Sequence, residues 1–126
     1  MNDEVVLDHS YVTDTFSVVL IDTVTVSISS LQLISNATSS IQLLIPVSNV
    51  CSPALQLNSN GTALVIGQNA ALYNRSGATA GNSILLNGSM IIKDEGRYTH
   101  NTLRGNSVLV GKLSSTDIYR NGIFEF

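Results

Sequence analysis

The side chains able to perform acid–base or metal chemistry are few and far apart in this sequence. His9 and His100 are the two histidines, and no acidic residue stands at ligand spacing from either on a predicted helix. A general base at His100 would also need a nucleophile and a cleft, and the sequence specifies neither. We therefore predict that His100 is a solvated histidine in a charged loop.

Two further features resemble chemical motifs but have plainer interpretations. Asp94 and Glu95 are neighbouring acids, which point to opposite sides of a strand, and they precede Gly96, so they indicate a charged turn. The small-residue run at 77–81 has neither Walker spacing nor a helix after it. We predict no catalytic, cofactor-binding or metal-binding residue, and an enzyme is the least favoured function.

Charge is distributed unevenly along the 126 residues. Residues 1–74 carry five acids and no Lys or Arg, whereas residues 75–126 carry all six bases and four acids. The mild net charge of −3 argues against a nucleic-acid partner. The asymmetry could steer identical subunits head to tail, or bring an acidic arm onto a neighbour's basic end. Two solvated faces of one monomer are the alternative interpretation.

A long uncharged stretch dominates the first half of the chain. Thr23 to Asn74 contains no charged residue, yet Ser, Thr, Asn and Gln interrupt its apolar runs throughout. A membrane-spanning helix needs roughly 20 apolar residues in a row, so no membrane partner is expected. Because a monomer normally keeps surface charge for solubility, this stretch predicts a surface that faces other protein.

Targeting and redox signals are sparse. The N-terminal Met-Asn-Asp-Glu has no basic region followed by an apolar core, so we expect no signal peptide. Cys51 is the single cysteine, which excludes a disulfide within the chain and predicts a buried structural thiol.

Short β-type patterns fill the chain from residue 13 onward. Val24, Val26 and Ile28 alternate with polar residues, and the phase slips at Ser29-Ser30, which requires a bulge or bend. Pro46 should end its strand or place it at an edge. Residues 1–12, with the apolar Val5, Val6 and Leu7, are expected to form an arm, and residues 13–126 a β domain.

Three Asn-Gly pairs lie between β-like runs, at Asn60-Gly61, Asn87-Gly88 and Asn121-Gly122. Asn-Gly supplies the two positive φ angles of a type I′ turn, so each pair predicts a β-hairpin. In the first, Leu57 would oppose Leu64. No repeat of fixed period stands out, and a β-helix is expected to show a tighter repeat than the spacings of these pairs. The predicted fold is therefore all-β: one compact domain of antiparallel strands and hairpins, a small barrel or sandwich, with an extended N-terminal arm.

The order of features from Thr62 to Arg104 resembles a known family. A short strand at Ala63–Ile66 leads to a small-residue segment at 74–81, then to strands at 84–86 and 90–92, and then to Lys93-Asp-Glu-Gly-Arg-Tyr98. This order is similar to that of the head-decoration proteins of lambda-like tailed phages. The resemblance implies a capsid-stabilising homotrimer on the threefold positions of the shell, with an N-terminal arm that adds a strand to it. The interface residues expected on this basis are Val5, Val6, Leu7, Arg97, Tyr98 and Arg104.

These observations favour a phage structural protein. The leading hypothesis is a capsid decoration or cement protein that oligomerises on the head, with the major capsid protein or another virion protein as partner. It would be located in the virion and assembled in the host cytoplasm. A tail, spike or fibre component is the first alternative. A carbohydrate-binding or adhesin-like β module is the second, although Trp is absent and the four Tyr are scattered.

Overall fold

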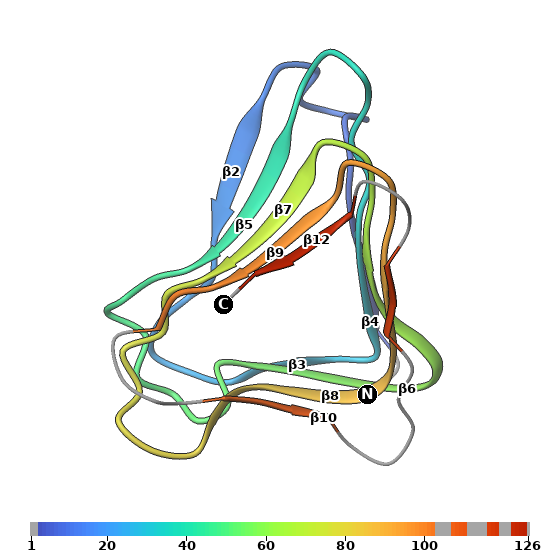
Figure 1. The fold of residues 1–126 in the computed structure, drawn as a ribbon. Coiled ribbons are helices and arrows are strands. Elements are labelled where there is room, and N and C mark those ends of the chain that lie inside the picture. The colour runs from blue at the N-terminus through green and yellow to red at the C-terminus, as the bar shows by residue number, and fades with distance from the viewer. Residues whose placement is uncertain (1–2, 103–106, 111–115, 119–121, 126) are drawn as a thin grey trace.

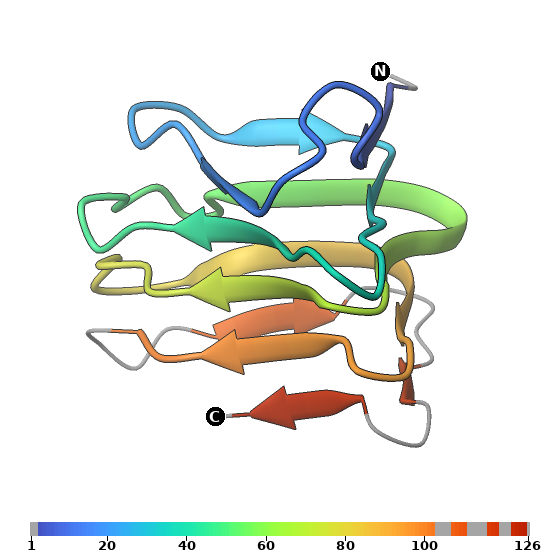
Figure 2. The same cartoon turned by 90° about the horizontal axis from the view of Figure 1, so that it is seen from above.

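The chain folds as a parallel β-solenoid in the computed structural model, which describes residues 3–102, 107–110, 116–118 and 122–125. Every strand pairing among these residues is parallel. Viewed along its axis, the chain winds around a triangle (Figure 1), and successive turns stack from the N-terminal to the C-terminal end (Figure 2). The described residues contain strands, turns and bends but no helix.

The triangle has three faces, which we number in chain order. Face 2 is a five-stranded sheet, and faces 1 and 3 together form a seven-stranded sheet that bends where β6 and β8 pass from one face to the other. Face 1 contains β1 (Glu4–Leu7), β4 (Ser30–Leu33), β11 (Thr116–Ile118) and the second parts of β6 (Leu55–Ile66) and β8 (Asn82–Ile92). Face 2 contains β2 (Phe16–Val19), β5 (Ile41–Ile45), β7 (Ala70–Asn74), β9 (Arg97–His100) and β12 (Ile123–Glu125). Face 3 contains β3 (Val26–Ile28), β10 (Ser107–Val110) and the first parts of β6 and β8.

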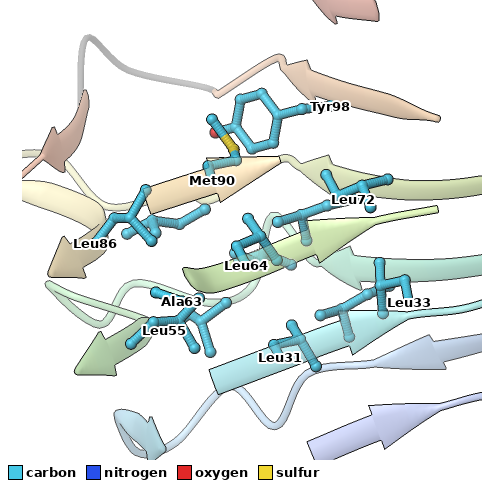
Figure 3. Close-up of a cluster of buried hydrophobic side chains, with 14 of the residues drawn as sticks. Leu31, Leu33, Leu55, Ala63, Leu64, Leu72, Leu86, Met90 and Tyr98 are labelled. Atoms are coloured by element: carbon cyan, nitrogen blue, oxygen red, sulfur yellow. The ribbon is translucent and has the colours of Figure 1, made fainter. Parts of the chain in front are cut away.

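The core consists of apolar columns that run along the solenoid axis. Alternate residues of each strand point inward, and parallel register places like residues above one another, as for Leu31, Leu64 and Met90 on face 1. Leu43, Leu72 and Tyr98 form the corresponding column on face 2. Figure 3 shows Leu31, Leu64 and Met90 of the first column and Leu72 and Tyr98 of the second in the interior of the solenoid. Their removal from water is the main favourable contribution to folding.

The prediction of an all-β fold is confirmed, but the prediction of antiparallel hairpins is wrong. Asn60-Gly61 lies inside the continuous strand β6, at the corner between faces 3 and 1, and Asn87-Gly88 lies at the same corner one turn later. Leu57 pairs with Leu86 of the next turn and does not oppose Leu64. Of the four residues in these two pairs only Gly88 has a positive φ, of +125°, so neither pair supplies the two positive φ angles of a type I′ turn, and each pair bends a strand where a hairpin would reverse it.

The third Asn-Gly pair belongs to a different corner. Asn121 lies outside the described residues, and Gly122 directly precedes β12. In β12, Phe124 pairs in parallel with Tyr98, so this segment also forms a ladder with an earlier turn. The parallel ladders leave no room for the predicted barrel or sandwich of antiparallel strands.

The solenoid has a spatial repeat that the sequence obscures. Backbone hydrogen bonds between successive turns join residues that are separated by as few as 24 positions, for Phe16 and Ser40, and by as many as 34, for Leu33 and Gly67. The corner segments vary in length, whereas the strands keep their register. A search for one fixed period therefore fails, even though the first two Asn-Gly pairs occupy equivalent positions.

Glycines form a second column at the corner between faces 1 and 2, where successive turns approach closely. A Cβ on Gly67 would lie 2.8 Å from the Leu33 carbonyl oxygen, and one on Gly96 would lie 2.6 Å from the Ile66 carbonyl oxygen. Real Cβ atoms almost never come this close to an oxygen, so this corner requires glycine.

Several local predictions agree with the structure. β5 ends at Ile45, directly before Pro46, and the predicted bend at Ser29-Ser30 is the corner between β3 and β4. Asp94 and Glu95 occupy an exposed turn closed by a 2.9 Å hydrogen bond from the Gly96 N–H to the Lys93 carbonyl.

Candidate functional site

The N-terminal turn of the solenoid ends in an apolar surface that the described chain leaves partly open. Six inward-pointing residues of β1, β2 and β3 and the segment after β2 are each only half-buried, and we call them the end surface: Val5, Leu7, Val18, Leu20, Val26 and Ile28. They line a shallow hollow of about 110 Å³, floored by Leu31, Leu43 and Leu55 of the next turn. The core of the solenoid is therefore accessible from this end.

Strand edges surround the end surface. Among the described residues, β1 pairs with β4, β2 with β5 and β3 with β6, so each of the three has one edge without a neighbouring strand. Such an edge offers a row of N–H and C=O groups to an incoming strand. A half-buried apolar surface bordered by three unpaired edges is suited to receiving another layer of β-structure.

Acidic residues border this end of the molecule. Asp3 and Glu4 are exposed at the start of β1. Hydrogen bonds from the side chain and backbone N–H of Ser10 lower the pKa of Asp8, so this carboxylate stays charged at neutral pH. All five acids of residues 1–28 lie in the first turn, which contains no base. The end surface is thus apolar at its centre and negative around it.

The flanks of the uncharged stretch carry exposed apolar side chains beside hydroxyl and amide groups. Ile21, Val24, Val47 and Val50 are exposed in successive passes of the corner between faces 2 and 3. The Asn49 side chain donates to the Ile21 carbonyl at 3.1 Å, which ties the two passes together. Cys51, predicted to be buried, is half-buried here, with its Sγ 3.7 Å from the Asp22 carbonyl oxygen.

Amide side chains at the opposite corner form a short ladder. Asn87 donates to the Asn58 side-chain oxygen at 2.8 Å, and Asn58 in turn lies 3.4 Å from the Ser27 hydroxyl. These amides satisfy each other between turns, which is the arrangement of stacked Asn in other parallel β-structures. Part of the Asn-rich composition therefore stabilises the solenoid itself.

A polar cluster interrupts the apolar core under face 2. Asn74 is fully buried and donates to the Ser83 hydroxyl at 2.8 Å and to the Tyr98 hydroxyl at 3.2 Å. The Tyr98 hydroxyl lies 2.9 Å from Nδ1 of His100. Burial raises the pKa of Tyr98 above its ordinary value. His100 is a buried residue of β9, which corrects the prediction of a solvated loop histidine.

A second hollow, of about 350 Å³, lies on face 2 next to this cluster, lined by Tyr73, Arg97, Thr99, His100, Asn101 and Glu125. Arg97 and Glu125 form an ion pair at 2.7 Å, and the Thr99 hydroxyl lies 3.3 Å from the same carboxylate oxygen. The hollow combines one aromatic ring with several hydrogen-bonding groups.

The predicted interface residues have different positions in the structure. Val5 and Leu7 face inward at the end surface, and Val6 points outward from β1. Arg97 is exposed on face 2, whereas the Tyr98 side chain is 1% exposed and stacks on Phe124 at a centroid distance of 4.8 Å, so it cannot contact a partner directly. Arg104 lies outside the described residues. The apolar pattern of residues 5–7 identified part of the end surface, but the contribution of Val18, Leu20, Val26 and Ile28 became visible only with the fold.

The part of the chain that the structure describes holds no group of three or more His, Cys, Asp or Glu side chains able to bind a metal ion. Within these residues, no helix has the length and hydrophobicity needed to cross a membrane. Comparisons of the chain with protein-family models, with curated proteins and with solved structures gave no match.

Proposed function

We propose that this chain is a structural protein of a phage virion, which works by self-association and by contact with other virion proteins. The observation that carries the proposal is the end surface, where half-buried core residues and unpaired strand edges meet. Solenoid proteins need a polar cap on their terminal repeats to stay soluble alone. An open apolar end is therefore most stable when protein covers it.

The flanks support the same proposal. Side chains such as Val24, Val47 and Val50 are exposed, and they belong to the stretch from Thr23 to Asn74, which contains no charged residue. Exposed apolar side chains with few charges are typical of the core of a protein–protein interface and less typical of the free surface of a monomer. A homotrimer is the assembly we favour, with the end surface and these flanks as its contact surfaces and with the major capsid protein or another virion protein as a further partner.

Two virion roles are compatible with this proposal. Capsid decoration rests on the resemblance between Thr62–Arg104 and the head-decoration proteins. A tail, spike or fibre component gains support from the solenoid, because turns stacked in parallel along one axis suit a rod. The proposal holds that the chain is not an enzyme in either role, and a turnover abolished by His100→Ala would contradict this part of it.

The test is the mass of the purified protein across micromolar concentrations, measured by sedimentation equilibrium. The proposal predicts a species heavier than the 13.4 kDa chain, with association that weakens in Val18→Lys. The matched control is Ser17→Lys, which places the same charge on the outer side of β2. A 13.4 kDa monomer at every concentration would contradict the proposal.

A carbohydrate-binding module is the second candidate, favoured by the hollow on face 2. Tyr73 offers a ring for stacking, and Arg97, Thr99 and Glu125 offer groups for sugar hydroxyls. Binding to a glycan array that is lost in both Tyr73→Ala and Glu125→Gln, but kept in Gln42→Ala on the same face, would support it. No glycan binding by the wild-type chain would remove this candidate.

A further inference from the structure

We infer that two adjoining hollows on face 2 bind an acidic sugar, a pyranose that carries a carboxylate, and that Arg75 recognises the carboxylate. The inference rests on the second function proposed above, carbohydrate binding, and names the class of sugar; it does not depend on self-association. Three features of the structure support it: the two hollows share a residue, several of their polar side chains are available to a ligand, and their two ends differ in charge.

The hollow on face 2 continues into a second hollow toward the corner between faces 2 and 3. The second hollow has a volume of about 180 Å³ and is lined by Val47, Arg75, Asn101 and Thr102. Asn101 lines both hollows, so the two adjoin on the outer surface of the solenoid. The larger hollow, of about 350 Å³, already falls in the size range of small-molecule sites.

Parallel register determines the order of the outward side chains across the two hollows. Tyr73 pairs with Thr99 and Thr99 with Glu125, so these three residues form one row across β7, β9 and β12. Arg75 follows Tyr73 by two positions, which places it on the same outward side with the two Cα atoms about 7 Å apart. The Asn101 N–H continues the ladder between β9 and β7, so Asn101 lies beside Arg75. One aromatic ring thus has a cation and an amide on one side and a carboxylate on the other.

Three polar side chains of the hollows are available to a ligand. In the part of the chain that the structure describes, no hydrogen bond or ion pair engages the Tyr73 hydroxyl, the Arg75 guanidinium or the Asn101 amide. Arg75 and Asn101 are exposed, and Tyr73 is half-buried. A ligand can therefore bind to these groups without breaking contacts within the protein.

The two ends of the joined hollows differ in charge. At one end, Arg97 and Thr99 both contact Oε2 of Glu125, so the charge of Arg97 is neutralised and the carboxylate is held in place. At the other end, Arg75 has no acidic partner within the described residues. A planar guanidinium binds a carboxylate through two parallel hydrogen bonds, whereas Glu125 repels an anion and accepts hydrogen bonds from hydroxyl groups. The difference selects a ligand with an acid group at one end and hydroxyls at the other.

An acidic sugar has this distribution of groups. Its ring would stack on Tyr73, with the carboxylate directed to Arg75 and a hydroxyl directed to Glu125. The Asn101 amide would contact a hydroxyl next to the carboxylate. A neutral sugar would leave the Arg75 guanidinium without an ionic partner, so we expect it to bind more weakly.

A glycan array with matched pairs tests the inference. Each pair consists of a glycan that ends in glucuronic or galacturonic acid and its carboxyl-reduced counterpart, which keeps the ring and lacks the charge. We expect wild type to bind the acidic member about tenfold more tightly, and Arg75→Gln to lose most of this preference. The matched control is Lys93→Gln, which removes the same charge from an exposed turn outside both hollows and should bind like wild type.

A second variant separates recognition of the carboxylate from charge alone. Arg75→Lys keeps the positive charge but lacks the planar pair of donors, so its preference for the acidic member should lie between those of wild type and Arg75→Gln. Urea unfolding checks that both variants fold. We expect midpoints like that of wild type, because the Arg75 side chain is exposed and engages no described residue.

Each other outcome overturns the inference in a recognisable way. Equal binding of acidic and carboxyl-reduced glycans contradicts the acidic class but leaves carbohydrate binding standing. Equal losses in Arg75→Gln and Lys93→Gln, or binding of polyglutamate as tight as that of the acidic glycans, indicate general charge attraction and contradict a sugar site. No glycan binding by wild type contradicts both the inference and carbohydrate binding, while the structural function is still decided by sedimentation.

Discussion

The first turn of the solenoid and the turn that follows it have nearly the same kinds of inward residue but very different burial. Val18 and Val5 of the first turn are half-buried, whereas Leu43 and Leu31, which stand below them in the same columns, are almost inaccessible to solvent. The difference arises because a central turn has a neighbour on both sides and the first turn has one. In a stack of this kind, stability is approximately a sum of nearest-neighbour contacts. Protein added at the first turn would thus supply the neighbour that this turn lacks among the described residues.

The largest expected effect comes from truncating inward side chains of one column, once in a central turn and once in the first turn. Leu72→Ala removes a fully buried side chain and should lower the free energy of unfolding by about 3 kcal/mol, since the cavity cannot collapse between two ladders. Val18→Ala, in the same column of the first turn, should cost less than about 1 kcal/mol, because the site is already open to water. Urea unfolding of dilute protein measures both. Equal losses would contradict the distinction between the two turns.

The next effect concerns the close approach of turns at the corners. In Gly96→Ala the new Cβ would lie 2.6 Å from the Ile66 carbonyl oxygen, so the ladder must shift, at a cost of about 2 kcal/mol. Gly61→Ala is the matched control, because nothing lies within 4 Å of its Cβ position. Thermal unfolding should show a clearly lower midpoint for the first variant and almost no change for the second. A Gly96→Ala variant as stable as wild type would mean that the turns are spaced more loosely than described.

A smaller effect should follow from the buried polar cluster. Tyr98→Phe removes the hydroxyl that lies near Asn74 and His100, which leaves a buried amide with one partner fewer and should cost about 1–2 kcal/mol. Thr99→Val on the same strand, which removes a partly buried contact to the half-exposed Glu125, is the comparison. Chemical denaturation at neutral pH distinguishes them, and a neutral Tyr98→Phe would show that the hydroxyl adds no stability.

The same residue predicts a loss of stability at alkaline pH. Burial raises the pKa of Tyr98 in the folded state, so above the ordinary tyrosine pKa of about 10 the unfolded chain releases this proton first. The stability that the folded state gains from keeping the Tyr98 phenol protonated is fully present below that pH, and it is lost as the pH rises above it. Wild type should therefore lose stability between neutral pH and alkaline pH more steeply than Tyr98→Phe. Parallel slopes for the two proteins would contradict the burial of the phenol.

The smallest effect is expected from the ion pair on face 2. Arg97 and Glu125 are 45% and 48% exposed, so water and salt screen their attraction. Arg97→Ala should change the free energy of unfolding by no more than about 0.5 kcal/mol. Denaturation at low salt measures it, and a loss as large as that of Leu72→Ala would show that the last turn depends on this pair.

The local patterns in the sequence predicted strands and bends well, because strands and bends depend on residues that are close together in the sequence. Val26 and Ile28 alternate as expected for a half-buried strand, and the phase slip at Ser29 marks a real corner. Pairing partners could not be predicted in the same way. Asn60-Gly61 has the composition of a hairpin turn, and antiparallel and parallel partners both satisfy the apolar face of Leu57.

The residues of the end surface could be predicted only in part from the sequence, because contacts between turns determine most of them. The apolar Val5–Leu7 segment and the acidic first residues pointed to an interaction surface at the N-terminal end. Leu20 and Val26 belong to the same surface because the chain winds past that end again, and no local spacing indicates this. The buried position of His100 likewise depends on the neighbouring turn, which carries Asn74 beside it.

Amide hydrogen exchange at low and at high micromolar concentration tests most directly whether protein covers the first turn. The N–H groups of Phe16 and Leu20 donate to the carbonyls of Ser40 and Leu44, on the side of β2 that faces β5. Because N–H groups alternate sides along a strand, those of Ser17 and Val19 point to the opposite edge of β2, which has no neighbouring strand among the described residues. Our account predicts that exchange at Ser17 and Val19 slows as concentration rises, while the central strands β5 and β7 change little. Exchange at these two amides that is equally fast at both concentrations would contradict it.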